Sequence, residues 1–357
     1  MGKKRVIVAM SGGVDSSVAA ALLKDQGYDV VGVTMQIWQP DASGSCCGLS
    51  GIEDARRVAR LLKIPHYVLN FKQVFQEKII SPFCAEYSRG RTPNPCVRCN
   101  QYIKFDALLK RARQLDADYV ATGHYARVQL NQRSKRFVLK KGRDSHKDQS
   151  YFLYALSQAQ LRRILMPLGE LTKQQVRGIA KKKGLPVADK PGSQEICFIP
   201  DNDYGRFLRQ HSPKTVQPGP IVNREGQVIG RHQGIAFYTI GQRKGIGIAY
   251  KEPLYVAAIE KKNNTIIVGS KDEVYAAGLV ANQLNFIYIK ECPARLRVKV
   301  RVRYQHQVAS ATVFAEGKKA VRICFDQPQW AVTPGQAAVM YQGDCVVGGG
   351  TINKVFS

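Results

Sequence analysis

The chain has 357 residues, which is enough for two or three domains with a substantial buried core. It carries 54 Lys and Arg against 27 Asp and Glu, a formal net charge of +27. Such an excess favours a polyanionic partner, either nucleic acid or an anionic membrane. No apolar run approaches the ~20 residues needed to span a bilayer, and the apolar stretch after Lys3-Lys4-Arg5 is too short for a signal peptide. We therefore expect a cytoplasmic protein without membrane contact, and nucleic acid as the partner.

Strand and helix patterns alternate from the N-terminus to Tyr125. Strands are predicted at Arg5–Met10, Val30–Met35, His66–Phe71 and Tyr119–Thr122, and helices at Asp15–Gln26, Gly51–Leu62 and Phe105–Leu115. Ser50 and Glu53 form a predicted capping box before the second helix. This alternation is typical of a parallel sheet wrapped by helices, with ligand sites at the carboxyl ends of the strands.

The stretch Met10-Ser11-Gly12-Gly13-Val14-Asp15-Ser16-Ser17 connects the first predicted strand to the first predicted helix. Its glycines let the backbone approach a ligand, and the N–H groups of the first helical turn point at an anion. No Gly-Lys-Ser/Thr closes the stretch, so it is not a Walker P-loop. It resembles the pyrophosphate loop of the PP-loop ATP pyrophosphatases, which implies ATP bound with its α-phosphate open to attack.

The predicted secondary-structure pattern changes twice in the remaining sequence. A hairpin is predicted at Ala126–Lys141, and helices at Ser150–Ala159 and at Thr172–Lys183, the latter with a Thr172/Gln175 capping box. Short β-like runs follow Asp203, and a second shift falls near Glu273–Leu279. We expect domains at residues 1–203, 204–273 and 274–357.

A predicted strand at Arg295–Tyr304 alternates strictly. Five apolar side chains take the even positions and five cations the odd ones, from Arg295 to Arg303. A solvated strand face is the plain interpretation. Like charges on one face repel one another, however, and a phosphate backbone removes that repulsion, so we favour nucleic-acid contact.

Nine cysteines in an intracellular chain with a nucleotide loop are expected to be reduced thiols with a chemical role or small buried hydrophobic residues. Cys96 and Cys99 form a Cys-x-x-Cys pair, which by itself fits half a zinc site, a redox pair or coincidence. A second spaced pair is missing, since Cys46 and Cys47 are adjacent, so a zinc site has little support and we assign no metal ligands. Cys197 is the other cysteine in a polar setting.

These features together resemble the bacterial tRNA-specific 2-thiouridylase family, essentially from end to end. The matching stretches are the PP-loop, Gly51–Arg56, Asn94-Pro95…Cys99-Asn100, Ala121–Tyr125, Lys147–Tyr151, Ser193–Phe198 and Gly241–Gly245. The resemblance implies a Rossmann-like PP-loop domain, a small central β-rich domain and a C-terminal β-barrel-like domain. It also implies 2-thiolation of the wobble uridine in the anticodon region of tRNA of the Lys, Glu and Gln types.

The chemistry fits that activity. Replacing a uracil oxygen by sulfur requires that oxygen to leave, and adenylation by ATP, with Mg²⁺ implied, makes it a leaving group. The resemblance assigns Cys197 as persulfide carrier and Cys99 as its catalytic partner, with a Cys99–Cys197 disulfide left for reduction. We expect basic surroundings to lower the pKa of both thiols. The sulfur would come from a cysteine desulfurase or a sulfur-relay protein.

Family positions imply the other site residues. ATP would be contacted by Ala9, Met10, Ser11, Gly12, Gly13, Val14, Asp15, Ser16, Met35 and Gly123. The flipped-out target base would be bordered by Asn94, Pro95 and Cys96. tRNA would be contacted by His124, Lys147, Asp148, Gln149, Arg303, Tyr304 and Gln336.

Two features keep alternatives open. Many family members carry Asp where this chain has Cys96, and Cys96, Cys99 and Cys197 would supply three ligands for an iron–sulfur cluster. A PP-loop ligase of the argininosuccinate synthase type is a second function, although it needs neither paired reactive cysteines nor this excess of positive charge. A non-catalytic RNA-binding module is a third, opposed by the intact loop and the two cysteines.

Overall fold

The computed structural model describes residues 2–38, 49–192, 196–199, 201, 203–212 and 216–357. It divides into two compact units. The first comprises Met1–Ile79, Cys96–Asn202 and Gly343–Val346, and the second comprises Ile80–Pro95, Asp203–Gln342 and Val347–Ser357.

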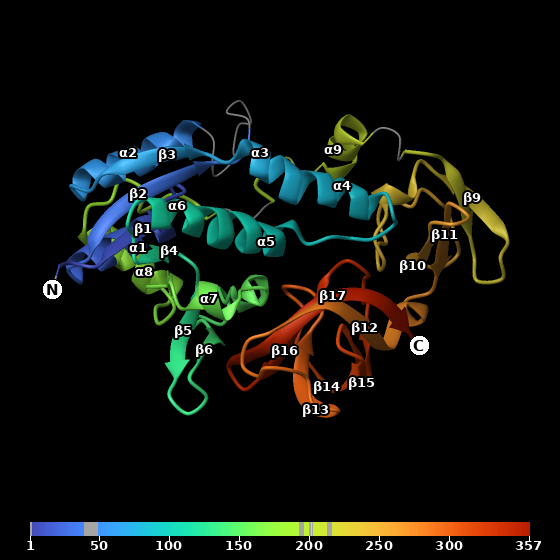
Figure 1. The fold of residues 1–357 in the computed structure, drawn as a ribbon. Helices are drawn as coiled ribbons and strands as arrows, with labels where there is room; N and C mark the ends of the chain where they lie inside the picture. The colour runs from blue at the N-terminus through green and yellow to red at the C-terminus, as the bar shows by residue number, and fades with distance from the viewer. Residues whose placement is uncertain (1, 39–48, 193–195, 200, 202, 213–215) are drawn as a thin grey trace. The chain divides into compact units, whose positions relative to one another are not determined.

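The first unit is built on a parallel sheet with the strand order β3-β2-β1-β4-β7 (Figure 1). Its strands are β1 (Arg5–Ala9), β2 (Asp29–Gln36), β3 (His66–Asn70), β4 (Tyr119–Ala121) and β7 (Ile164–Leu165). The four predicted strands are confirmed within two residues at each end. The short fifth strand, β7, has no counterpart among the predicted elements.

Helices α1 (Val14–Asp25), α2 (Leu49–Leu61) and α8 (Lys173–Lys182) bury one apolar cluster against the sheet. Val6 and Val8 of β1 belong to this cluster, as the two-residue period of a strand dictates. The Thr172/Gln175 capping box of α8 is confirmed. The predicted Ser50/Glu53 box is wrong, because α2 already includes Leu49 and Ser50 lies inside it.

A continuous run of helix leads through the predicted thiol segment. It comprises α5 (Pro95–Arg98), the π-helical segment η2 (Cys99–Ala107) and α6 (Leu108–Gln114). An earlier run comprises α3 (Lys72–Phe75), the π-helical η1 (Gln76–Ile80) and α4 (Ser81–Tyr87). The predicted helix Phe105–Leu115 therefore begins ten residues too late. π-Helical turns are rare and are frequently found at functional sites.

The hairpin prediction is confirmed by β5 (Ala126–Asn131) and β6 (Arg136–Lys141), whose residue Lys140 pairs with Cys345. The predicted helix Ser150–Ala159 is wrong. The chain instead forms a 3-10 turn, η3 (Ser150–Leu153), and a separate helix, α7 (Gln158–Leu161). Ser157 begins α7 with its own capping box to Gln160, a Ser-x-x-Gln signal that is visible in the sequence.

The second unit contains a four-stranded sheet of order β10-β11-β8-β9. The elements are α9 (Tyr204–His211), β8 (Gly219–Val222), β9 (Val228–His232), η5 (Ile235–Phe237), β10 (Tyr255–Glu260), β11 (Thr265–Gly269) and η6 (Asp272–Val274). Phe207 of α9 packs edge-on against Phe83 of α4, with ring centroids 6.0 Å apart. Ile221, Val256 and Ile266 lie in the core of this sheet.

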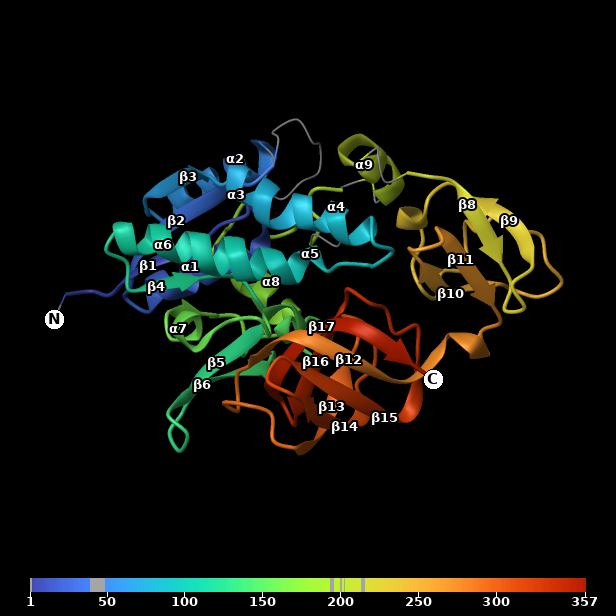
Figure 2. The same ribbon diagram turned by 45° about the vertical axis from the view of Figure 1, so that its right-hand side comes forward.

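Six antiparallel strands then form a closed barrel (Figure 2). They are β12 (Tyr275–Phe286), β13 (Arg295–Arg301), β14 (Ala309–Glu316), β15 (Ala320–Trp330), β16 (Ala337–Gln342) and β17 (Cys345–Phe356). Pairing of β12 with both β15 and β17 closes the barrel. The predicted fold class, a parallel-sheet domain followed by a β-rich domain and a β-barrel, is confirmed.

The alternating basic strand is β13. Val298 and Val300 are buried in the barrel core, and Arg295, Arg297 and Lys299 are exposed. The strand ends at Arg301, so Arg303 and Tyr304 lie in the following turn.

Candidate functional site

The residues predicted to contact ATP gather at the carboxyl edge of the parallel sheet. Ala9 ends β1, Met35 lies near the end of β2, and Gly123 follows β4. These three strands are neighbours in the sheet, with β1 between the other two. The fold therefore brings together residues that lie far apart in the sequence at the edge where α/β proteins bind ligands.

Internal hydrogen bonds hold the loop between β1 and α1. The Ser16 hydroxyl accepts the Ser11 N–H at 3.2 Å and lies 3.2 Å from the Gly13 carbonyl, to which it donates. Ser17 donates to the same carbonyl at 2.9 Å. Two of the loop's hydroxyls thus fix its backbone, and the first-turn N–H groups of α1 have the geometry that binds anions.

Two glycines are required by close backbone contact. Gly12 has φ +72°, and a Cβ there would overlap the carbonyl group of Gly51 at the start of α2. A Cβ on Gly123 would lie 2.7 Å from the backbone N of Ser16. Gly123 therefore permits the end of β4 to pack directly against the first turn of α1.

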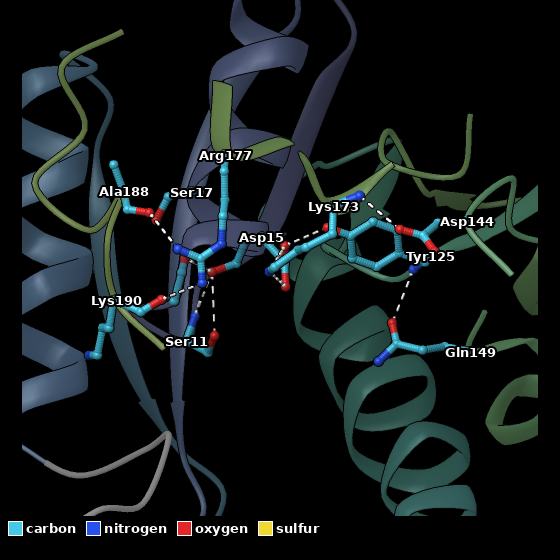
Figure 3. Close-up of polar contacts among 12 residues, drawn as sticks. Ser11, Asp15, Ser17, Tyr125, Asp144, Gln149, Lys173, Arg177, Ala188 and Lys190 are labelled. Carbon is cyan, nitrogen blue, oxygen red and sulfur yellow. Dashed lines mark hydrogen bonds and ion pairs between the residues drawn. The ribbon is translucent and has the colours of Figure 1, made fainter. Parts of the chain in front are cut away.

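Asp15, at the start of α1, lies in a polar cluster drawn in Figure 3. Both of its carboxylate oxygens accept hydrogen bonds from the Lys173 ammonium, at 2.6 and 2.7 Å, and Oδ1 also accepts from the Tyr125 hydroxyl at 2.7 Å. Burial and the adjacent Asp15 carboxylate raise the pKa of Tyr125, so its hydroxyl keeps its proton.

A second lysine, Lys190, also contacts the loop between β1 and α1. Lys190 Nζ donates to the Gly12 carbonyl at 3.3 Å and to the Asp54 carboxylate at 2.6 Å. Arg177 of α8 donates to the carbonyls of Ala188 and Lys190 at 3.3 Å each and so braces this segment. Neither lysine is predicted from the sequence, because no local signal connects them to loop residues that lie 158 and 178 positions away.

Cys99 is the first residue of the π-helical segment η2 and is partly exposed. Burial raises the pKa of its thiol, and the positive charge of Lys104 lowers it by less. The expectation of a lowered pKa is therefore wrong for Cys99, because desolvation of the thiolate outweighs the effect of the Lys104 charge. Asn100, next in sequence, is buried and donates to the Phe152 carbonyl at 3.3 Å.

Cys197 lies in a turn closed by a 2.9 Å hydrogen bond from the Ile199 N–H to the Ile196 carbonyl. Phe198 anchors this turn in an aromatic cluster with Trp38 and Phe75, at centroid distances of 6.3 and 5.7 Å. Residues 193–195 and Cys46-Cys47 lie outside the described residues.

Cys96, Cys99 and Cys197 are all thiols, and each is partly exposed. Within the described ranges, no group of three or more His, Cys, Asp or Glu side chains gathers closely enough to hold a metal ion. The three thiols named above are part of those ranges, so this conformation does not assemble them as ligands.

Several predicted tRNA-contacting side chains are engaged within the protein. His124 is 7% exposed, and its Nδ1 lies 2.7 Å from the Thr122 hydroxyl. Burial, with a smaller effect from Lys104, holds its pKa well below the usual value. Asp148 is buried and accepts from the N–H groups of Gly142 and Ser150.

The other residues predicted to contact tRNA lie in both structural units. The Gln149 side chain accepts from the Tyr125 N–H at 3.0 Å, whereas Lys147 is exposed at the surface. In the second unit, Arg303 donates to the Thr333 hydroxyl at 3.0 Å. Gln336 is 8% exposed, and its amide donates to the carbonyls of Thr92 and Pro93 at 3.0 and 3.4 Å.

Comparison with known families agrees with this organisation. Three family models match: "tRNA methyl transferase HUP domain" at residues 4–201, "tRNA methyl transferase PRC-barrel domain" at 205–270 and "Aminomethyltransferase beta-barrel domain" at 276–352. Together with the loop at the sheet edge, they define a nucleotide-binding protein of the HUP class, in which the PP-loop implies the use of ATP.

Full-length relatives are more specific. The chain is 52% identical over 360 residues to the tRNA-specific 2-thiouridylase MnmA of Carboxydothermus hydrogenoformans, covering 99% of both chains. It is 50% identical to the protein of the same name from Clostridioides difficile, covering 98% of both. The chain belongs to the tRNA-specific 2-thiouridylase family.

The likeness to solved structures is more remote. One is the U34-tRNA thiolase NcsA of Methanococcus maripaludis with its [4Fe-4S] cluster, at 19% identity and a TM-score of 0.36 over 59% of this chain and 67% of that one. In the described part of the chain, no helix is long and apolar enough to cross a membrane.

Proposed function

We propose that the protein is an ATP-dependent tRNA-uridine 2-sulfurtransferase acting on the wobble uridine of tRNA in the cytoplasm. The observation that carries the proposal is the identity of about half of all positions, from end to end, with 2-thiouridylases. Two features of the chain support it: the anion-binding loop at the sheet edge, and a Cys99 thiol at the start of a π-helical segment.

The first chemical step takes place at the loop. Ala9–Ser16, Met35 and Gly123 surround the nucleotide, and first-turn N–H groups of α1 hold its β- and γ-phosphates. The uridine O2 attacks the α-phosphorus, the bond to the bridging oxygen breaks and pyrophosphate leaves. The base is then adenylated at O2, which makes that oxygen a leaving group.

Sulfur transfer follows. The terminal sulfur of a Cys197 persulfide attacks C2 of the base and AMP departs with the oxygen. Cys99 then gives up its proton to water and attacks the Cys197 sulfur as a thiolate, which releases the thiocarbonyl and leaves a Cys99–Cys197 disulfide that a two-electron reductant must reopen. A second route has Cys99 attack the persulfide first, so that hydrosulfide is the nucleophile at C2.

A resident Mg²⁺ site does not fit the loop as it stands. Asp15 and Asp54, the carboxylates beside it, are both bonded to lysine ammonium groups. We propose that Mg²⁺ arrives bound to the phosphates of ATP, whose charge it neutralises. The iron–sulfur alternative is tested separately: anaerobically purified protein that contains iron and shows cluster absorbance would replace the persulfide route.

For tRNA, we propose that Asn94, Pro95 and Cys96 border the flipped-out base. The further contacts are His124, Lys147, Asp148, Gln149, Arg303, Tyr304 and Gln336, through side chain or backbone. We also propose domain boundaries at residues 1–203, 204–273 and 274–357, which the ranges of the three family models support.

The decisive experiment is mass analysis of unmodified tRNA after incubation with the protein, ATP, Mg²⁺ and a persulfide source. We expect an oxygen-to-sulfur exchange at the wobble uridine and none in a tRNA with cytidine there. Methyl addition would instead agree with the names of two family models, and pyrophosphate release driven by a small carboxylic acid without tRNA would favour a ligase.

Cys99→Ser and Cys197→Ser should each abolish thiolation, with Cys324→Ser as the matched control.

A further inference from the structure

The ammonium of Lys173 lies at the ATP loop although it comes from a distant part of the chain. It contacts both oxygens of Asp15, 158 residues away, at 2.6 and 2.7 Å, and its side chain is 17% exposed (Figure 3). Asp15 is the second residue of α1, so the ammonium lies next to the first turn of this helix, whose N–H groups would bind the phosphates.

The position of this ammonium is fixed from several directions. Lys173 is the first residue of α8, its backbone N–H donates to Asp144 at 2.9 Å, and the Thr172 capping box precedes it. The Tyr125 ring lies beneath the ammonium, 5.9 Å from its centroid, while the Tyr125 hydroxyl holds Asp15. Both partners of the ion pair are therefore oriented before any ligand binds.

An ion pair that is largely removed from water contributes little to folding stability, because desolvation offsets much of the attraction. The arrangement has a clearer consequence for an anion in the loop. The Asp15 carboxylate alone would repel the phosphates of ATP, and the adjacent ammonium cancels that repulsion. A lysine ammonium has three donors, and two reach Asp15, so a third remains for a phosphate oxygen.

We propose that Lys173 is a phosphate-binding residue of the ATP site, which Asp15 and Tyr125 hold in position for the β- and γ-phosphates. This inference rests on the proposed function in that it requires ATP at Ser11–Ser17. When the α-phosphorus is attacked, negative charge grows on the departing pyrophosphate. A preorganised ammonium at that place stabilises it without forming or breaking a bond of its own.

Calorimetric binding to the full-length protein tests the proposal with three probes: ATP, inorganic pyrophosphate and AMP. Lys173→Met should weaken ATP and pyrophosphate about 10-fold to 100-fold, the value of a charge-assisted hydrogen bond, and leave AMP unchanged. Lys182→Met changes an exposed lysine on the same helix and should alter none of the three. Equal loss for AMP and pyrophosphate would overturn the proposal in favour of general damage to the site.

A double variant distinguishes phosphate binding from simple neutralisation of Asp15, and it leaves no unpaired carboxylate to disturb folding. If Lys173 contacts phosphate, Asp15→Asn/Lys173→Met binds pyrophosphate more weakly than Asp15→Asn alone. If the two variants bind equally, Lys173 only neutralises Asp15 and the proposal is wrong. Wild-type protein that binds neither ATP nor pyrophosphate would contradict the proposed function itself, which separates the two failures.

Discussion

The side-chain amide of Gln336 donates a 3.0 Å hydrogen bond to the carbonyl oxygen of Thr92, 244 residues earlier in the chain. The Thr92 N–H in turn donates to the Pro334 carbonyl at 2.9 Å, so the loop before β16 holds this segment on two sides. Asn94, Pro95 and Cys96 follow directly. A residue proposed to contact tRNA thus also fixes the backbone that leads to the proposed base-binding segment.

Gln336→Ala should therefore destabilise the second unit by about 1–3 kcal/mol, because the buried carbonyl of Pro93 and the half-buried carbonyl of Thr92 lose a donor. Chemical denaturation measures this change. Gln342→Ala is the matched control, since that amide is exposed and bonds a single carbonyl at 3.2 Å. Unchanged stability together with weakened tRNA binding would mean that Gln336 acts on tRNA directly rather than through Thr92.

The Cys99 thiol should react slowly at neutral pH, because burial raises its pKa and keeps it protonated. Alkylation followed by mass analysis of the Cys99 peptide should show a reaction rate that still rises at pH values above the pKa of an ordinary thiol. Lys104→Met should shift that profile further upward, since the positive charge lowers the thiol pKa.

The exposed Lys110 on the adjoining α6 provides the control for that titration. It pairs with Asp106, so Lys110→Met removes a cation from the same helical run without changing the surroundings of Cys99. A profile for Lys104→Met that coincides with wild type would show that Lys104 does not act on the thiol.

His124 should make stability depend on pH. Its folded pKa is depressed by burial, so the unfolded chain binds a proton more readily. The stability that neutral His124 contributes is present above the unfolded pKa of about 6.5 and is lost as pH falls below it, by up to ~1.4 kcal/mol per pH unit. Urea unfolding at several pH values should show a smaller loss in His124→Gln than in wild type, with a remainder from His66 and His232, whose pKa values burial also lowers. His146→Gln, at an exposed histidine, should retain the wild-type loss.

The exposed cations of β13 should contact the phosphate backbone of tRNA. Arg295→Glu/Lys299→Glu should weaken tRNA binding and reduce the slope of affinity against salt by ~1 for each phosphate that the variant no longer binds. Arg297 is unsuitable for this test, because it already forms two 2.7 Å hydrogen bonds with Asp326. Lys318→Glu/Lys319→Glu, in the turn after β14, is the control. Equal tRNA affinity of both double variants would show that the cations of β13 are only solvent-exposed charges and do not contact tRNA.

Local signals predict much of the fold. The strand runs, the Thr172/Gln175 capping box and the alternation in β13 each depend on residues within one element, and each is confirmed. The predicted helix Ser150–Ala159 fails because Asp148 captures the Ser150 N–H and hydroxyl in a turn, and Ser157 starts a new helix. The π-helical start at Cys99 has no counterpart in periodicity rules for α-helices and strands.

The sequence by itself determined the chemistry, because the phosphate loop, the cysteine segments and the basic strand are each contiguous and need only local geometry to be recognised. Only the tertiary structure determined which charged side chains contact that loop. Lys173 and Lys190 approach it from distant segments, and Asp15 gains its lysine and tyrosine partners only when α8 and the segment after β4 pack beside α1. Such contacts depend on how whole elements pack, and no pattern within one segment records them.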